Sequence, residues 1–272
     1  MLIGSSCKMH LSVDEVRDWL RRCAALLAPI DGVDVFVLPP FVCLPMAAAE
    51  LRGTRVAYGS QNMHWEERGA FTGEVSPTMI TAFGGTIVEL GHAERRRHFG
   101  ETDATVNLKV RSALRHGLRP IICVGEQARA APVADDTVQA QVRHALEGVA
   151  AEDLDEVVIA YEPVWAIGQA QAAEPAYVFA RHRAIRAVLV DTYGTAAGAR
   201  PTIIYGGSVA PDNAGELAAD PAVQGLFVGR SALNPESFRR IIVEAATSAT
   251  SSPSSTVARS SWPRRARTRT RH

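Results

Sequence analysis

Short apolar segments alternate with helix-forming segments along nearly the whole chain. Bounded apolar runs of this length are typical of strands buried in a parallel sheet. Eight such runs occur, and a helix signal follows each of them: residues 2–4, 33–38, 55–58, 86–90, 120–124, 157–161, 202–205 and 226–228. Eight strand–helix units within roughly 245 residues predict an α/β chain folded as a single (β/α)₈ barrel, which typically takes about 250 residues.

The competing α/β architecture is a doubly wound sheet. That fold usually carries a glycine-rich fingerprint after its first strand, and the Gly-Ser-Ser-Cys sequence at 4–7 is not one. Helix-start signals follow the strands instead, among them the capping box at 12–15 and the Asn-Pro pair at 234–235. These features favour the barrel.

Composition narrows the class of protein. With 272 residues that are 47% hydrophobic, the chain can build one large core. No apolar run approaches the roughly 20 residues that span a bilayer, and no basic region precedes the first strand, so we expect neither a membrane contact nor a signal peptide. The four cysteines lack a CxxC pair, which is typical of reduced thiols in a cytoplasmic protein. We expect no metal and no cofactor.

The C-terminal residues 247–272 differ from the rest of the chain. They contain six arginines and no acidic residue, whereas residues 1–246 hold 23 basic against 29 acidic residues. A segment rich in Ser, Thr and Arg cannot build a core, so we expect a disordered tail after a barrel domain at 1–246. Such a tail could bind nucleic acid, but we expect a dispensable extension.

The sixth apolar run, at 157–161, leads directly into Glu162. Active sites of a (β/α)₈ barrel lie where strands end. A carboxylate there is partly desolvated, so its pKa should rise toward the range of a general base. The apolar segment between Pro163 and Gly168 suits a flap that closes over a site and excludes water. The structural alternative is a glutamate that only caps the strand.

Two further side chains follow strand ends. His92 precedes an expected helical turn at 93–98, whose N-terminus would keep the imidazole neutral and able to polarise a carbonyl. Lys8 follows the first strand and is one of two lysines in the chain, so it could stabilise developing negative charge. The alternatives are a capping histidine and a solvated lysine.

Glycine-rich turns follow the seventh and eighth strands. Gly206-Gly207-Ser208 and Gly229-Arg230-Ser231 could offer backbone N–H groups to a phosphate, at the loops where barrels commonly bind one. Gly168 could add another N–H group. A base, a neutral electrophile, a cation and a phosphate cradle predict an enolising site for a small phosphorylated sugar.

Several stretches together are specific enough to indicate a family. They are Cys7-Lys8-Met9, residues 69–74, residues 88–96, residues 160–168 and residues 205–209. Over residues 1–246 the chain resembles the triosephosphate isomerases, whose fold is the TIM barrel. The resemblance implies that Glu162 is the base, His92 the electrophile and Lys8 the electrostatic residue.

The same resemblance implies supporting roles. Glu94 would orient Lys8, while Ser6 would lie near the substrate carbonyl. The phosphate would be held by Gly168, Ser208, Gly229 and Arg230. The family is usually dimeric, with the loop that contains Phe71 and Thr72 reaching into the neighbouring site. Thr72 and Gln61 would then support Lys8 across the interface of a homodimer.

Departures from the family pattern concern the substrate. The chain has Ser6 where the family normally has Asn, Cys7 where it has Trp, Ala93 where it has Ser and Arg230 where it has a second glycine. Serine is shorter than asparagine, so Ser6 leaves room at the reacting end. Arg230 adds a cation beside the phosphate cradle.

Residues 61–65 and 225–232 are more similar to a paralogous branch, the L-erythrulose-1-phosphate isomerases of erythritol-type catabolism. Their substrate is dihydroxyacetone phosphate with an added hydroxymethyl group. We therefore expect conversion of L-erythrulose 1-phosphate to D-erythrulose 4-phosphate. A glycolytic and gluconeogenic triosephosphate isomerase is the alternative. A non-catalytic phosphate-binding barrel is disfavoured because Lys8, His92 and Glu162 are all present.

Overall fold

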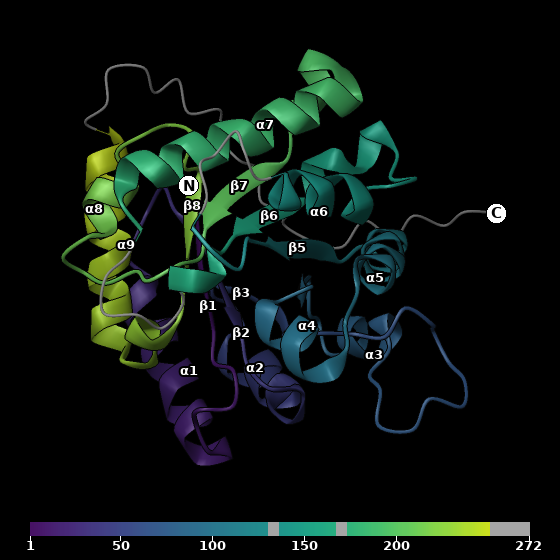
Figure 1. Ribbon diagram of the computed structural model, residues 1–272. Helices are drawn as coiled ribbons and strands as arrows, with labels where there is room; N and C mark the ends of the chain where they lie inside the picture. Colours follow the sequence, from purple (N-terminus) through teal and green to yellow (C-terminus); the bar gives the residue numbers. More distant parts are fainter. Residues whose placement is uncertain (130–135, 167–172, 251–272) are drawn as a thin grey trace.

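Eight parallel strands close into a barrel in sequence order (Figure 1). The computed structural model describes residues 1–129, 136–166 and 173–250. The strands are β1 Leu2–Ser6, β2 Asp34–Leu38, β3 Ala57–Ser60, β4 Ile87–Leu90, β5 Arg119–Val124, β6 Val158–Tyr161, β7 Thr202–Tyr205 and β8 Gly225–Val228. The predicted (β/α)₈ barrel is therefore confirmed.

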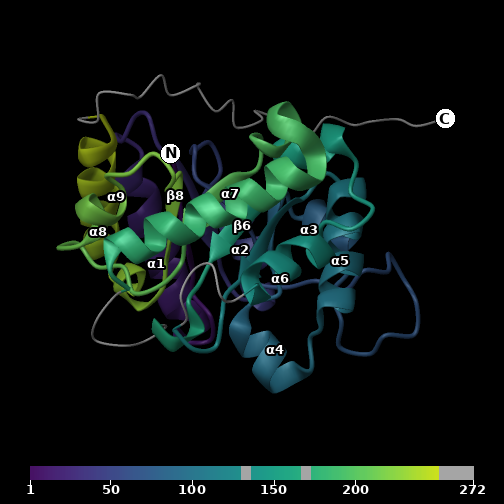
Figure 2. The ribbon, with the colours of Figure 1, turned by 45° about the horizontal axis from the view of Figure 1, so that its top comes forward.

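Helices surround the barrel on its outside (Figures 1 and 2). They are α1 Val13–Leu27, α2 Leu44–Glu50, α3 Pro77–Ala82, α4 Ala93–Phe99, α5 Asp103–Arg115, α6 Thr137–Ala145, α7 Pro175–Gly198, α8 Ala214–Leu217 and α9 Pro235–Thr250. Short 3₁₀ turns add η1 Phe41–Cys43, η2 Ala151–Glu156, η3 Val164–Ala166 and η4 Arg230–Leu233. None of the described helices is long and apolar enough to cross a membrane.

The strands are buried on both faces, so alternate side chains enter two different cores. One core fills the barrel and includes Ile87, Val158, Ala160 and Phe227. The other lies between strands and helices, and it contains the intervening residues. On β4 and β6 every second residue points into the barrel, and the last inward position of each lies at the carboxyl end. Those positions carry Glu89 and Glu162.

Local capping signals predicted from the sequence are present. The Ser12 Oγ accepts a hydrogen bond from the Glu15 N–H at 3.3 Å, and a Glu15 carboxylate oxygen accepts one from the Ser12 N–H at 2.8 Å. At the start of α9, the Asn234 Oδ1 accepts from the Ser237 N–H at 2.9 Å. The four cysteines are buried and unpaired, as predicted.

Some element boundaries differ from the sequence-based expectation. β1 continues to Ser6, because Ser5 and Ser6 pair with Val37 and Leu38 of β2. Pairing with a neighbouring strand here outweighs the polar composition that predicted a loop from residue 5. α7 continues to Gly198 rather than ending at residue 192, with a break at Gly194, where φ is 79° and ψ is 163°.

The C-terminal helix also runs past the expected domain boundary. α9 ends at Thr250, four residues beyond residue 246, because its apolar face packs on α1 and α8. The rest of the predicted tail, residues 251–272, lies outside the described residues.

A buried ion pair between Lys109 of α5 and Glu101 is hydrogen-bonded to the segments that follow β3 and β4. The Lys109 Nζ donates to Glu101 Oε1 and, at 2.8 Å, to Asn62 Oδ1. Glu101 also accepts from the Gly91 N–H at 3.1 Å, just after β4. The Lys109 and Glu101 side chains are only 6% and 2% exposed. Removing Lys109 would leave the buried Glu101 carboxylate with Arg95 alone, whose Nε is 3.7 Å from Glu101 Oε2.

We predict that Lys109→Met lowers the free energy of unfolding by about 3–5 kcal/mol, because the buried Glu101 carboxylate would lose its nearest cation and keep only the more distant Arg95, at 3.7 Å. The measurement is urea unfolding at neutral pH. Arg17→Met is the control, because Arg17 pairs with Asp14 in an exposed bridge at 2.8 Å, and such pairs contribute about 1 kcal/mol or less. Equal losses in the two variants would contradict the prediction.

Candidate active site

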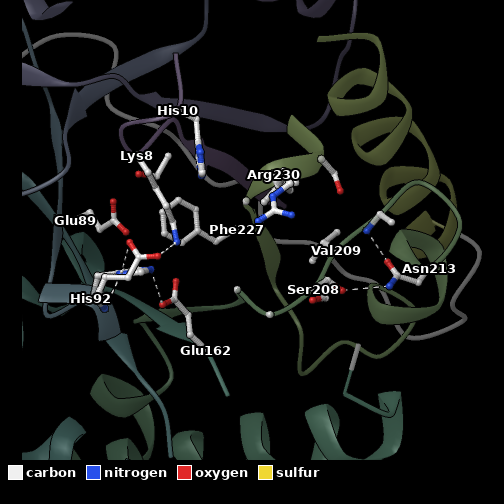
Figure 3. Close-up of a pocket in the computed structure, with 18 residues that line it drawn as sticks. Lys8, His10, Glu89, His92, Glu162, Ser208, Val209, Asn213, Phe227 and Arg230 are labelled. Carbon is white, nitrogen blue, oxygen red and sulfur yellow. Dashed lines mark hydrogen bonds and ion pairs between the residues drawn. The ribbon is translucent and has the colours of Figure 1, made fainter. Parts of the chain in front are cut away.

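A pocket of about 480 Å³ opens at the carboxyl ends of the strands (Figure 3). This volume lies within the usual range of small-molecule sites, roughly 300–1,000 Å³. Most of the residues proposed from the sequence line it: Ser6, Lys8, His92, Glu94, Glu162, Ser208, Gly229 and Arg230. Gly168 lies outside the described residues.

Glu162 lies at the end of β6 with its side chain buried. Burial raises its pKa well above the ordinary value, and the nearby Glu89 carboxylate raises it further, whereas Lys8 opposes the shift. Its Oε2 atom has no hydrogen-bond partner. A Cβ at residue 206 would lie 2.8 Å from Glu162 Oε1, so Gly206 leaves room for the carboxylate. These conditions suit a general base.

His92 is the N-cap of α4. Its Nδ1 accepts a hydrogen bond from the Glu94 N–H at 3.1 Å, so the proton of the neutral ring lies on Nε2. Nε2 is 3.4 Å from Glu162 Oε2. Burial, followed by the positive charge of Lys8, lowers the pKa of His92 to about 4. The imidazole is therefore neutral at physiological pH and can donate its Nε2 proton to a carbonyl oxygen.

Lys8 supplies the cation of the site. Its backbone φ is +48°, which is the left-handed region and, among the described residues, is shared only with glycines. Its Nζ donates to Glu94 Oε1 at 2.6 Å. Gln61 Nε2 donates to the Lys8 carbonyl at 3.1 Å and to the Leu38 carbonyl at 2.9 Å. These contacts lie within one chain, so Gln61 reaches Lys8 without a partner subunit.

Two of the remaining predicted residues line the opposite side of the same pocket. Ser208 and Arg230 lie across the pocket from Glu89 and His92 (Figure 3). The Ser208 hydroxyl donates to the Ala166 carbonyl at 2.9 Å, which joins the end of β7 to the segment after Glu162. Thr72 is exposed and does not line the pocket of its own chain.

Glu89 was missed by the sequence analysis, although it lines the pocket. Burial is the main cause that raises its pKa, to about 7. One donor atom each of Glu89, His92 and Glu162 lie within 4.8 Å of one another, so these three residues could hold a metal ion. Such an ion would engage both the base and the electrophile, so metal binding and proton transfer exclude each other here. The sequence feature that could have identified Glu89 is its charge within the otherwise apolar run 86–90.

Glu126 was also missed, and it positions the residues that follow the base. Its Oε1 atom accepts hydrogen bonds from the Tyr161 hydroxyl at 2.9 Å, Trp165 Nε1 at 2.9 Å and the Tyr177 hydroxyl at 2.7 Å. Its carbonyl accepts from the Val164 N–H at 3.0 Å. The buried carboxylate therefore fixes both sides of Glu162. Its place shortly after β5 was the available signal.

Comparison with known proteins agrees with this geometry. A sequence profile described as triosephosphate isomerase matches residues 1–245. The triosephosphate isomerase of Chloroflexus aurantiacus is 47% identical over 243 residues, which cover 89% of this chain and 97% of that protein. The triosephosphate isomerase of Herpetosiphon aurantiacus is 46% identical over 243 residues, with the same coverage. The L-erythrulose-1-phosphate isomerase of Mesorhizobium japonicum is 41% identical over 244 residues, covering 88% of this chain and 95% of that protein.

The barrel, the pocket at its carboxyl end and the matched profile define an isomerase. The matched profile and relatives cover nearly all of the described barrel. The chain belongs to the triosephosphate isomerase family.

The raised pKa of Glu89 predicts a pH dependence of stability. The folded chain keeps the Glu89 proton up to about pH 7, whereas the unfolded chain releases it near the ordinary value of 4.5. The stability associated with this proton is present below pH 4.5 and is lost as the pH rises to 7. Glu89→Gln should therefore gain stability relative to the wild type over this interval, by roughly 3 kcal/mol.

Urea unfolding of both proteins at several pH values between 4.5 and 7 measures this difference. Glu66→Gln is the matched control, because the Glu66 side chain is exposed. A difference between wild type and Glu89→Gln that stays constant with pH would contradict the prediction.

Proposed function

We propose that this chain converts L-erythrulose 1-phosphate to D-erythrulose 4-phosphate. The observation that carries the proposal is Ser6, which lines the pocket near the base in place of the larger asparagine of the family pattern. The substrate differs from dihydroxyacetone phosphate by one hydroxymethyl group at the reacting end. A smaller side chain at that end leaves volume for the added group. The similarity to a protein named L-erythrulose-1-phosphate isomerase supports the same conclusion.

The proposed reaction moves the carbonyl from C2 to C3. The Glu162 carboxylate removes the proton from C3, and its electron pair forms the double bond of an enediolate between C2 and C3. The Nε2 proton of His92 stabilises the oxygen on C2, and the charge of Lys8 stabilises the enediolate. The proton of the C3 hydroxyl moves to the oxygen on C2, and return of the Glu162 proton to C2 then leaves the carbonyl on C3. Counted from the other end, the product is D-erythrulose 4-phosphate.

The phosphate is proposed to bind at the side of the pocket formed by the loops after β7 and β8. Ser208, Gly229 and Arg230 line this side. The Arg230 side chain is exposed and makes no ion pair within the residues that the structure describes. An unpaired guanidinium can bind a phosphate through two parallel hydrogen bonds. The carboxylates of Glu89 and Glu162 would repel a phosphate from the opposite side.

The second candidate is the triose reaction of glycolysis and gluconeogenesis. The same base and imidazole would act on C1 and C2 of dihydroxyacetone phosphate. The higher identity to proteins named triosephosphate isomerase favours this candidate.

We also propose a homodimer. The loop between β3 and α3 projects from the barrel, as Figure 1 shows. Phe71 within it is 43% exposed and Thr72 is exposed. Phe71 packs on His64, with ring centroids 4.1 Å apart, so the loop has internal support. An exposed aromatic on a supported loop suits insertion beside Lys8 of a second copy.

We predict that the full-length chain prefers L-erythrulose 1-phosphate over D-glyceraldehyde 3-phosphate by about a hundredfold in kcat/KM, roughly 2.7 kcal/mol of transition-state binding. Ser6→Asn should reduce that preference because it refills the volume. Side-by-side assays of both proteins measure it. The reverse preference in the wild type would favour the glycolytic candidate. Turnover of neither substrate, with no further effect of Glu162→Gln, would indicate a phosphate-binding barrel.

We predict that Arg230→Met raises KM about tenfold for either sugar phosphate while kcat changes little, because the guanidinium binds ground state and transition state alike. Steady-state kinetics at two salt concentrations measure this, and the salt dependence of KM should weaken in the variant. Arg52→Met is the control, since Arg52 is exposed and does not line the pocket. An unchanged KM in Arg230→Met would place the phosphate elsewhere.

A further inference from the structure

Glu89 is a buried carboxylate that the proton transfer does not use. It is 3% exposed and lines the pocket from the inward face of β4. Its hydrogen-bonding neighbour within the described chain is the hydroxyl of Ser6. A carboxylate has about four acceptor positions, and a single hydroxyl leaves most of them open toward the pocket. Because Glu89 lines the pocket, its remaining acceptor positions are available to a hydrogen-bond donor of a bound ligand.

The surroundings of Glu89 restrict what that donor can be. Glu162 lies beside it, so a second anion is excluded by repulsion. The Lys8 ammonium already pairs with Glu94 at 2.6 Å. A neutral hydroxyl group fits both conditions, because it donates one hydrogen bond and adds no charge.

The pocket has two chemically different sides (Figure 3). Arg230 and Ser208 lie on one side, whereas Glu89 and His92 lie on the other. With the phosphate at the Arg230 side, the carbon chain runs past Glu162 and ends near Ser6 and Glu89. A three-carbon substrate ends at its reacting carbon. A four-carbon substrate places a further hydroxymethyl group beyond it.

We propose that Glu89 and Ser6 form a hydroxyl-binding subsite for the terminal hydroxymethyl group of a four-carbon sugar phosphate, and that Glu89 determines the preference for this substrate. The proposal rests on the function proposed above and identifies the group that recognises the added carbon. Ser6 supplies the volume, and its hydroxyl holds the Glu89 carboxylate. The terminal hydroxyl donates to a free Glu89 oxygen.

An electrostatic role is the competing explanation, because the Glu89 charge raises the pKa of Glu162. That role would not distinguish a four-carbon from a three-carbon substrate. It would instead shift the pH dependence of kcat/KM for both substrates alike. The ratio of the two kcat/KM values therefore separates the two explanations.

The test compares Glu89→Leu, Glu89→Gln and wild type on L-erythrulose 1-phosphate and D-glyceraldehyde 3-phosphate, with the full-length chain. Glu89→Leu is expected to lower the ratio of the two kcat/KM values about a hundredfold. Glu89→Gln keeps an acceptor oxygen and should lower it only about tenfold. Glu66→Leu, at an exposed glutamate, should leave the ratio at the wild-type value.

Unreactive alcohols test recognition without turnover. Erythritol 4-phosphate has one more carbon and hydroxyl than glycerol 3-phosphate, so the ratio of their inhibition constants reports the subsite directly. Wild type should bind the four-carbon alcohol about tenfold more tightly, and Glu89→Leu should lose this advantage. The thermal midpoint of each variant shows whether it is folded. If Glu89→Leu does not fold, Glu89→Gln takes its place in this test.

The outcomes separate the two proposals. If wild type prefers the four-carbon substrate and Glu89→Leu retains the preference, the Glu89 subsite is wrong and the proposed function stands. An equal loss on both substrates, with shifted pH profiles, would assign Glu89 the electrostatic role and overturn the subsite. If wild type neither turns over L-erythrulose 1-phosphate nor discriminates the two alcohols, both proposals fail.

Discussion

The chemistry of this site depends on the burial of the Glu162 carboxylate at the mouth of the closed barrel. Burial is the main cause that raises its pKa, and the same burial lowers the pKa of His92. One desolvated space thus produces a stronger base and a neutral hydrogen-bond donor, with Glu162 Oε2 and His92 Nε2 3.4 Å apart. Barrel closure creates that space, because it brings the ends of β4 and β6 to the same pocket.

Residues outside the pocket hold Lys8 and Glu162 in position. Lys8 is held in a left-handed backbone conformation, which the Gln61 side chain supports through the Lys8 carbonyl. Glu126 collects three hydrogen bonds from residues on both sides of Glu162. The side chains proposed for catalysis are therefore positioned by the half-buried Gln61 and the buried Glu126, neither of which lines the pocket. Substitution of Gln61 or Glu126 would move Lys8 or the segment around Glu162 without removing a charge from the pocket.

In the proposed function, one set of pocket residues carries out the reaction and another set selects the substrate. The proposed base, imidazole and cation would serve any enediolate reaction of a sugar phosphate. Ser6 and Glu89 lie at the side that a longer substrate would reach, and they belong to β1 and β4, which also carry Lys8 and His92 in the loops that follow. Under the proposed function, substrate choice and chemistry therefore depend on the same two strands, and a change at Ser6 or Glu89 would alter the substrate preference while leaving Lys8 and His92 in place.

The sequence by itself determined the alternation of strands and helices, and this predicted the barrel and placed Lys8, His92 and Glu162 at strand ends. It did not reveal that Glu89 lies beside Glu162, that Gln61 holds Lys8 within one chain, or that Glu126 anchors the segment after the base. Periodicity and chain position are local properties, so they identify buried positions and strand ends. Which buried side chains meet depends on strand register and barrel closure, which bring residues 73 positions apart, such as Glu89 and Glu162, to adjacent places. Only the tertiary structure decides those contacts.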